Sequence, residues 1–263
     1  MQLTEALARA LIGGALAGLV ALAGRHARAL TTSGAIAGSI VGTLSIAAGW
    51  SWGMLLLGFF VSASALSRVG AQRKAERVGS VVEKGDQRDA GQVLANGGLY
   101  AMAALFYLAS PSPVWYALSA GALAASAADT WATEVGTLLG SEPISILSGE
   151  RVAPGTSGGI SIAGTAAGVA GALFIAAGAT IAHWPASFAA VALGGVAGAL
   201  ADSLLGGTLE ARRWCDLCAL PTERLVHTCG TATRHIGGLV KFDNDAVNAV
   251  CSGIGALVAL LLS

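Results

Sequence analysis

Three acidic residues stand inside long apolar stretches of the sequence, where ionised side chains are rare. Asp129 and Glu134 lie in one stretch and Asp202 in another, and neither stretch contains a Lys or Arg. Ionisable groups within a membrane are costly and usually functional. Two carboxylates that meet without a basic partner repel each other unless a divalent cation or a shared proton offsets their charge. We expect Asp129 and Asp202 to bind Mg²⁺; the alternatives are separate acids that reach the membrane interface, or a proton relay.

A Gly-rich turn offers a second kind of chemistry. Residues 154–159 read Pro-Gly-Thr-Ser-Gly-Gly at the start of an apolar stretch. A helix that begins there would present free backbone N–H groups and the positive end of its dipole to a phosphate. No Gly-Lys-Thr/Ser follows, so this is not a Walker A loop. We expect Thr156, Ser157 and Gly158 to cradle a phosphate, although Gly-rich turns are common in this composition.

Further polar residues open the last apolar stretch. Asp243 or Asn244 would serve as the N-cap of a helix there. Capping leaves Asp245 and Asn248 unexplained, and their i, i+3 spacing puts them on one face of the first turn. Both are expected in the same layer as Asp129.

Three cysteines and one histidine form two close pairs near the C-terminus. Two residues separate Cys215 from Cys218, one separates His227 from Cys229, and eight stand between the pairs. Thiolates and an imidazole in this pattern suit tetrahedral Zn²⁺, and with all four positions filled such a site would be structural. The alternative is reduced cysteines that pack a small cap, because disulfides are disfavoured in the cytoplasm. Cys251 lies in an apolar stretch, where we expect it only to pack.

The composition excludes an ordinary water-soluble globule. Of the 263 residues only 11% are charged, 54% are hydrophobic and 37 are Gly, and the formal net charge is zero. A soluble domain averages about 25% charged residues, and a chain without net charge has no general attraction to nucleic acid. We therefore expect an all-α, polytopic helix bundle in the membrane, in which small residues let the helices approach closely.

About eight apolar segments are long enough to be transmembrane helices. We expect them at residues 7–24, 32–49, 51–66, 93–110, 114–139, 158–182, 186–206 and 245–262, the third being short. The chain would form one transmembrane domain over residues 1–263, with a cytoplasmic Cys/His-containing loop at 207–244. No basic region precedes Leu7, which argues against a cleavable signal peptide.

The basic residues gather on one side of this arrangement. Of the 15 Lys and Arg residues, all but Arg9 fall in the loops 25–31, 67–92, 140–157 and 207–244. By the positive-inside rule these loops are cytoplasmic and both termini lie outside, as expected in the cell inner membrane. Asp129 and Asp202 come late in segments that run towards the cytoplasm, so both would lie near its surface.

Two similar strings hint at an internal repeat. Residues 32–36 read Thr-Ser-Gly-Ala-Ile and residues 156–160 read Thr-Ser-Gly-Gly-Ile, each at the cytoplasmic start of an expected segment. This would fit a parallel four-plus-four duplication. The alternative is that these residue types are simply common in the chain.

Five motifs carry a family resemblance. In order they are Gln-Val-Leu-Ala-Asn-Gly-Gly at 92–98, Ala-Asp-Thr-Trp-Ala-Thr-Glu-Val-Gly at 128–136, Gly-Thr-Ser-Gly-Gly-Ile-Ser at 155–161, Asp-Ser-Leu-Leu-Gly at 202–206 and Asp-Asn-Asp-Ala-Val-Asn at 243–248. Together they resemble the family of integral membrane proteins that contains plant phytyl-phosphate kinase and human transmembrane protein 19. The resemblance covers nearly the whole chain, and it implies phosphorylation of an isoprenyl monophosphate, phytyl or geranylgeranyl, to the diphosphate.

More distant relatives suggest the nucleotide. Phytol and dolichol kinases carry a similar Asp-x-x-Ala stretch before a Gly-rich Ser/Thr turn, and they favour CTP; the matching residues here are 129–132 and 155–157. Those kinases usually have a Lys just before the Ser/Thr of that turn. Here the nearest basic residue is Arg151, so Lys84, Arg88 or Arg151 would supply the contact with the nucleotide phosphates.

The resemblance implies a phosphotransferase that uses magnesium with CTP or ATP. Asp129 and Asp202 would bind Mg²⁺, with Glu134 and Asp245 as further ligands. The phosphates and the nucleotide would be contacted by Lys84, Arg88, Asn96, Arg151, Thr156, Ser157, Gly158, Asp243, Asn244 and Asn248.

Two other functions would use the same residues. A lipid-phosphate or cation-coupled transporter also needs acids within the membrane, but its site lies near the midplane, whereas these motifs fall at segment ends. A CTP-dependent nucleotidyl transferase would leave the nucleotide on the lipid phosphate and release pyrophosphate. The sequence leaves open the isoprenoid chain length, the choice between CTP and ATP, and the oligomeric state.

Overall fold

The computed structural model describes residues 2–78, 87–139 and 142–263. Over these ranges the chain forms nine helices and five short strands. The helices are α1 (Gln2–His26), α2 (Thr32–Ala48), α3 (Trp50–Arg68), α4 (Ala71–Val78), α5 (Ala90–Ala109), α6 (Pro113–Leu139), α7 (Ile162–Ile181), α8 (Phe188–Thr208) and α9 (Asn244–Leu261). The strands are β1 (Ile144–Ser145), β2 (Gly159–Ile160), β3 (Arg212–Cys215), β4 (Leu220–Thr222) and β5 (Arg234–Gly237).

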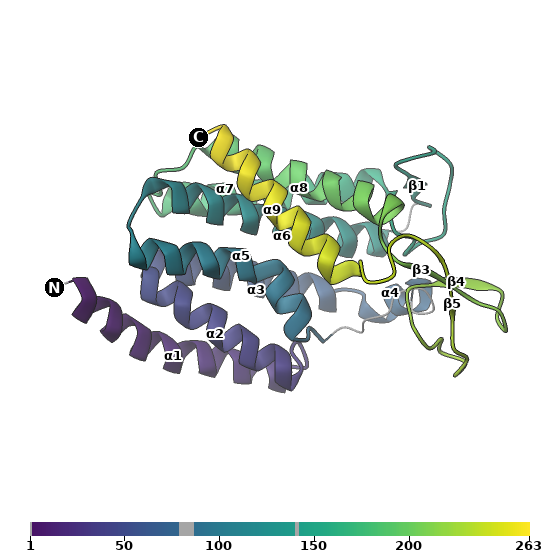
Figure 1. Cartoon of the computed structure of the whole chain (residues 1–263), viewed down its shortest axis with the longest axis horizontal. Helices are drawn as coiled ribbons and strands as arrows, with labels where there is room; N and C mark the ends of the chain where they lie inside the picture. The colour runs from purple at the N-terminus through teal and green to yellow at the C-terminus, as the bar shows by residue number, and fades with distance from the viewer. Residues whose placement is uncertain (1, 79–86, 140–141) are drawn as a thin grey trace.

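All helices except α4 are long, and they match the eight segments expected from the sequence (Figure 1). They run to and fro between two ends of a bundle. The five strands and α4 lie at one end, here called the cap end, and both chain termini lie at the other. The third segment was expected to be short, but the corresponding helix α3 has 19 residues, so that prediction was wrong.

Large apolar side chains cover the outside of the bundle, the reverse of a soluble protein. Leu11 and Ile181, for example, are each 78% exposed. Within the described residues, six helices are long and apolar enough to cross a membrane, namely α1, α3, α5, α7, α8 and α9, while α2 is apolar but shorter. The protein is therefore a polytopic membrane helix bundle, as predicted.

The central helix is α6. It packs against α3, α5, α7, α8 and α9, and every residue from Ser119 to Ala128 is buried. These residues are Ala, Gly, Ser and one Leu, and such small side chains suit contact between helices rather than with lipid. This explains why α6, although 27 residues long, is not among the six helices whose length and composition alone would let them cross a membrane.

Glycines bring α6, α8 and α9 into backbone contact. A Cβ added to Gly121 would lie 2.4 Å from the carbonyl oxygen of Gly255, and one added to Gly198 would lie 2.3 Å from the Cβ of Ala125. Only residues without a side chain permit such an approach. Asp129 and Asp202 stand one helical turn beyond Ala125 and Gly198, so this packing fixes how far apart the two carboxylates are.

The chain between α8 and α9 folds into a small cap, residues 209–243. Its three-stranded antiparallel sheet has the order β4-β3-β5. A two-stranded sheet of β1 and β2 joins the ends of the connection from α6 to α7. The expected all-α class therefore holds for the membrane bundle, and the strands are confined to the loops at the cap end.

Candidate functional site

A cavity of about 720 Å³ lies at the cap end, within the size range of pockets for small ligands. Its walls come from α4, α6, α7, α8, the Gly-rich turn, the cap and the start of α9. Of the site residues expected from the sequence, it is lined by Arg88, Asp129, Glu134, Thr156, Ser157, Gly158, Asp202, Asp243, Asn244 and Asp245.

The carboxyl groups of Asp129 and Asp202 interact directly. The nearby charges that act most strongly on Asp202 are those of two other acids, Asp129 and Glu210. Its Oδ1 atom is buried and has no hydrogen-bond partner among the residues that the structure describes. A buried carboxylate oxygen without a donor is a free ligand atom, and hard oxygen ligands suit Mg²⁺. This donor set fits a divalent cation.

Glu134 has a different environment from the one expected. The sequence suggested an acid without a basic partner, but the amino group of Lys74, on α4, forms an ion pair with its carboxylate. The Ser67 hydroxyl also donates to Glu134, at 2.5 Å. Lys74 itself is buried and donates to the carbonyl oxygens of Leu66 and Ser67, each at 2.8 Å. Glu134 therefore anchors α4 to α6, and the prediction of an unpaired acid was wrong.

Arg88 is the expected basic residue that faces the cavity. Its guanidinium donates to the hydroxyls of Ser64 and Ser67, at 3.3 and 3.1 Å. Burial lowers the pKa of Arg88 from its usual value, and the Glu134 carboxylate opposes that shift. The backbone of Arg88 is held by the loop between α1 and α2, because its N–H donates to the oxygen of Ala29 at 3.0 Å.

The other two expected basic residues are Arg151, which does not line the cavity, and Lys84. Arg151 is exposed and pairs with Glu142 at 2.9 Å, so it does not serve the turn next to it. Lys84 lies outside the described residues. Basic residues that sequence reasoning missed do line the cavity: Lys74, Arg77, Arg213, Arg224 and Lys241.

The Gly-rich turn does not open a helix, as the sequence suggested. α7 begins at Ile162, where the Ser161 hydroxyl accepts from the Gly164 N–H at 3.1 Å. The turn stands before β2 and packs against the end of α8, since a Cβ on Gly158 would lie 2.7 Å from the Cα of Gly207. Gly158 also has a φ of +80°, which favours glycine. The expected phosphate site therefore lacks a helix dipole.

Glu210 is a further acid that sequence reasoning missed. It follows α8 in the chain, is only 4% exposed, and lines the cavity. Burial raises its pKa to about 8, and the charge of Glu223 acts in the same direction, while a hydrogen bond with Ser157 opposes them. Asp202, Gly206 and Glu210 recur every four residues, a helical spacing that would have placed Glu210 on the same face.

The start of α9 confirms that one of the two expected residues is the N-cap, and it shows which of the other expected polar residues reach the cavity. Asp243 is the N-cap and accepts from the Ala246 N–H at 3.0 Å. Asp245 packs against the start of α5, where a Cβ on Gly91 would lie 2.2 Å from its Oδ2. Asn248 is buried but does not line the cavity. Nor does Asn96, whose side chain donates to the carbonyl of Gln92 in its own helix.

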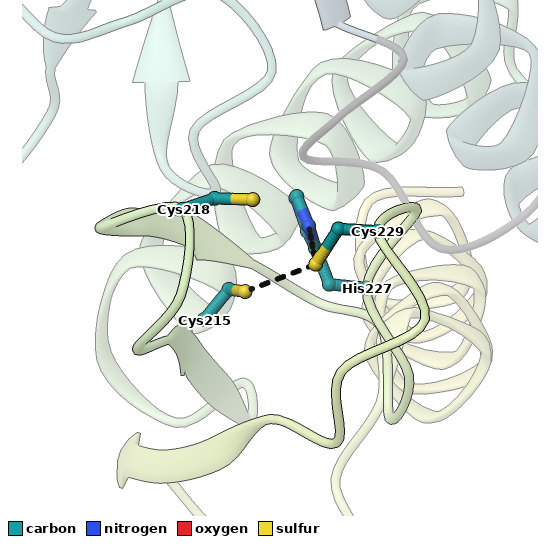
Figure 2. A group of neighbouring side chains, drawn as sticks. All are labelled: Cys215, Cys218, His227 and Cys229. Atoms are coloured by element: carbon teal, nitrogen blue, oxygen red, sulfur yellow. Dashed lines mark hydrogen bonds between the residues drawn. The ribbon is translucent and has the colours of Figure 1, made fainter.

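The four Cys and His residues converge in the cap (Figure 2). One ligand atom of each of Cys215, Cys218, His227 and Cys229 lies within 4.8 Å of the others. The Sγ atoms of Cys215 and Cys229 are 3.6 Å apart, and Nδ1 of His227 is 3.3 Å from Cys229 Sγ. None of the four lines the cavity. Cys251, by contrast, is buried in α9 beside Asp202.

Comparison with known proteins gives one family. The family described as integral membrane protein DUF92 matches residues 15–256. Protein PGR of Arabidopsis thaliana is 30% identical over 262 residues, which cover 89% of this chain and 89% of that protein. An uncharacterized membrane protein of Methanocaldococcus jannaschii is 34% identical over 215 residues, 79% of this chain and 86% of that protein. No solved structure matches the chain.

Proposed function

The chain belongs to the DUF92 family of integral membrane proteins, and we propose that it is an isoprenyl-phosphate kinase. It would transfer the terminal phosphoryl group of a nucleoside triphosphate, CTP in preference to ATP, to phytyl or geranylgeranyl monophosphate. The observation that carries this proposal is the Asp129–Asp202 pair, in which a buried carboxylate oxygen has no hydrogen-bond partner among the described residues. The pair lies in a cavity shared by basic residues and the Gly-rich turn.

The reaction needs no strong base. An ionised oxygen of the acceptor phosphate attacks the γ-phosphorus and forms the new P–O bond. The bond from the γ-phosphorus to the bridging oxygen breaks, and its electron pair leaves with the nucleoside diphosphate. Such a transfer depends on charge neutralisation and in-line positioning, which a cavity with charges of both signs would supply.

Each part of the cavity has a role in this scheme. Asp129 and Asp202 would hold Mg²⁺, which neutralises charge on the phosphates when bound. Arg88 would contact a phosphate from the segment before α5, and the Thr156 and Ser157 hydroxyls would do so from the turn. Asp245 would add a third carboxylate to those of Asp129 and Asp202 in the cavity wall. Glu134, which is paired with Lys74, would instead position α4 against α6.

An apolar part of the cavity wall, here called the side arm, supports a lipid substrate. Gly168 and Val169 of α7 and Val196, Ala199 and Leu200 of α8 line it. Val169 and Leu200 are also partly exposed, and in this proposal the side arm opens towards the lipid between α7 and α8. An isoprenyl chain would occupy this arm while its phosphate meets the nucleotide at the cap end, which would face the cytoplasm.

The experiment uses the purified full chain in detergent with Mg²⁺, geranylgeranyl or phytyl monophosphate, and CTP or ATP in parallel. Lipid products are identified by mass spectrometry. We expect the diphosphate, and at least about a 100-fold loss of rate in both Asp129→Asn and Asp202→Asn. A cytidylated lipid with released pyrophosphate would replace the kinase by a nucleotidyl transferase. A folded protein that makes neither product would favour a transporter.

The side arm has its own test. Ala199→Trp would fill the arm between α7 and α8, so KM for geranylgeranyl monophosphate should rise at least about tenfold. KM for a short acceptor such as isopentenyl monophosphate should change little, because its chain ends before the arm. Equal effects on both acceptors would show that the lipid chain lies elsewhere.

A further inference from the structure

The cap holds a cluster of metal-ligating residues that the proposed reaction does not use. The ligand atoms of Cys215, Cys218, His227 and Cys229 converge in a space narrower than 4.8 Å (Figure 2). With Zn–S near 2.3 Å and Zn–N near 2.0–2.1 Å, tetrahedral zinc would separate two sulfur ligands by about 3.8 Å and a sulfur from a nitrogen by about 3.5 Å. The separations here are 3.6 Å from Cys215 Sγ to Cys229 Sγ and 3.3 Å from Cys229 Sγ to His227 Nδ1.

The backbone around the ligands has the form of two tight turns. Cys215 ends β3, and the hairpin to β4 turns through Cys218 and Ala219, which has a positive φ of 53°. His227 and Cys229 lie in a second turn, closed by a 2.8 Å hydrogen bond from the Gly230 N–H to the His227 oxygen. Each turn thus presents two ligands from a short loop, the arrangement in which zinc ribbons hold their metal.

The chain between the two turns reaches the cavity. Residues 219–226 include Glu223 and Arg224, both of which line it. The Ser157 hydroxyl donates to Glu223 Oε1 at 3.1 Å, so this segment is bonded directly to the Gly-rich turn. The Arg224 carbonyl accepts from the Thr233 hydroxyl at 2.5 Å, which ties the segment back into the cap.

We propose that Cys215, Cys218, His227 and Cys229 bind one structural Zn²⁺ that fastens both ends of segment 219–226, and that through Glu223 and Ser157 this fixes the Gly-rich turn at the cavity. All four coordination positions are filled by protein, so the metal has no open position for chemistry. The cap has too small a sheet to order this segment by burial alone, since it contains only short strands in the described structure. Metal binding supplies the missing stability.

The first measurement is the metal content of the purified full chain in detergent, by plasma mass spectrometry. We expect one zinc per chain, lost in Cys215→Ser and in Cys229→Ser and retained in Cys251→Ser, whose cysteine lies in α9 away from the cluster. Cobalt in place of zinc should give the visible absorption typical of tetrahedral thiolate coordination. A folded wild-type chain without zinc, or with Cys215 and Cys229 joined as a disulfide, would overturn the proposal.

The second measurement is hydrogen–deuterium exchange without any substrate, so its outcome does not depend on the proposed kinase reaction. Chelation of zinc should speed exchange at least about tenfold in peptides that cover 219–226 and also in those that cover 154–159, with α1 unchanged. Adding zinc alone should reverse the change.

A matched variant separates the metal from the link to the turn. Glu223→Ala should keep the zinc and the protection of Cys215–Cys218, yet lose the protection of residues 154–159. If chelation or Glu223→Ala leaves exchange at 154–159 unchanged, the zinc site does not position the turn, and that part of the proposal fails.

Discussion

Lys74, at the edge of the membrane, neutralises an acid of the transmembrane helix α6 and so makes that acid a structural residue. It is buried, and its amino group is surrounded by the Glu134 carboxylate and two backbone oxygens. Removing one partner of such a pair leaves an uncompensated buried charge, which costs about 3–5 kcal/mol. We expect Lys74→Met to lower the free energy of unfolding in detergent by an amount of this order, measured by thermal or denaturant unfolding.

The double variant Lys74→Met/Glu134→Met is the control for that prediction. Because it removes both charges and keeps the side-chain volume, most of the stability should return. If the double variant is as unstable as the sum of the two single variants, the pair does not act as a unit and the predicted coupling is absent.

Glu210 makes stability depend on pH. Its pKa rises from 4.5 to about 8, because the carboxyl is buried and lies near other acids. The native state therefore holds a proton that the unfolded chain releases above about pH 4.5, so stability should fall as the pH rises towards about 8 and then level off. Melting temperatures without Mg²⁺ should decrease over this window by several degrees, and Glu210→Gln should flatten the curve. A slope unchanged in Glu210→Gln would assign the titration to another group.

The acids of the site were largely predictable from the sequence, whereas their partners were not. Asp129, Asp202 and Asp245 stood out because carboxylates are rare at the ends of apolar segments. Lys74 and Arg224 gave no such signal, since basic residues are common in loops. They reach the site because of the way the loops fold over the bundle, and that folding depends on contacts between residues far apart in the sequence.

Among the helices, α8 packs against α6 with little room for change. A Cβ at Gly198 would lie 2.3 Å from Ala125 Cβ and 2.9 Å from the Cys251 oxygen. Gly198→Ala should therefore cost about 1–3 kcal/mol by overpacking, and it should reduce activity further by moving Asp202 relative to Asp129. Thermal unfolding and kinase assays measure the two effects.

Gly18→Ala is the matched control, because nothing lies within 4 Å of a Cβ added there in α1. That change should stabilise the helix slightly, by about 0.5–1 kcal/mol, and leave activity intact. Equal losses in the two variants would mean that close packing of α8 is not what matters.

Helix positions were also predictable, and helix starts less so. Each of the eight expected segments corresponds to a helix. They could be predicted because a long run of apolar residues is a strong signal of a transmembrane helix. The start of α7 was placed too early, at residue 158 instead of Ile162. The turn and β2 pair with the loop after α6 there, and hydropathy does not distinguish a buried turn from a helix. The four-plus-four repeat stays a prediction.

For the molecule as a whole, the two termini share one end of the bundle and the cap occupies the other (Figure 1). Together with the basic loops at the cap end, this predicts termini outside the cell membrane and the cap in the cytoplasm. Alkaline phosphatase, which is active only after export, should be active when fused to the C-terminus and inactive when inserted after Gly230. The opposite pattern would reverse the orientation and move the cavity to the outer face.

The central place of α6 has a consequence for how the chain enters the bilayer during synthesis. It carries Asp129 and Glu134 and is less apolar than the helices around it. The free energy of its transfer from the translocon into lipid is therefore less favourable than theirs. Helices α1–α3 and α5 emerge first and provide a surface on which α6 buries its small residues. Glu134 finds its partners in Ser67 and Lys74, which precede α6, whereas the Asp129 carboxyl meets Asp202 only when α8 arrives. We therefore expect insertion of α6 to be coupled to folding, and a chain interrupted before α9, which packs against both α6 and α8, to be degraded faster in the membrane than the full chain.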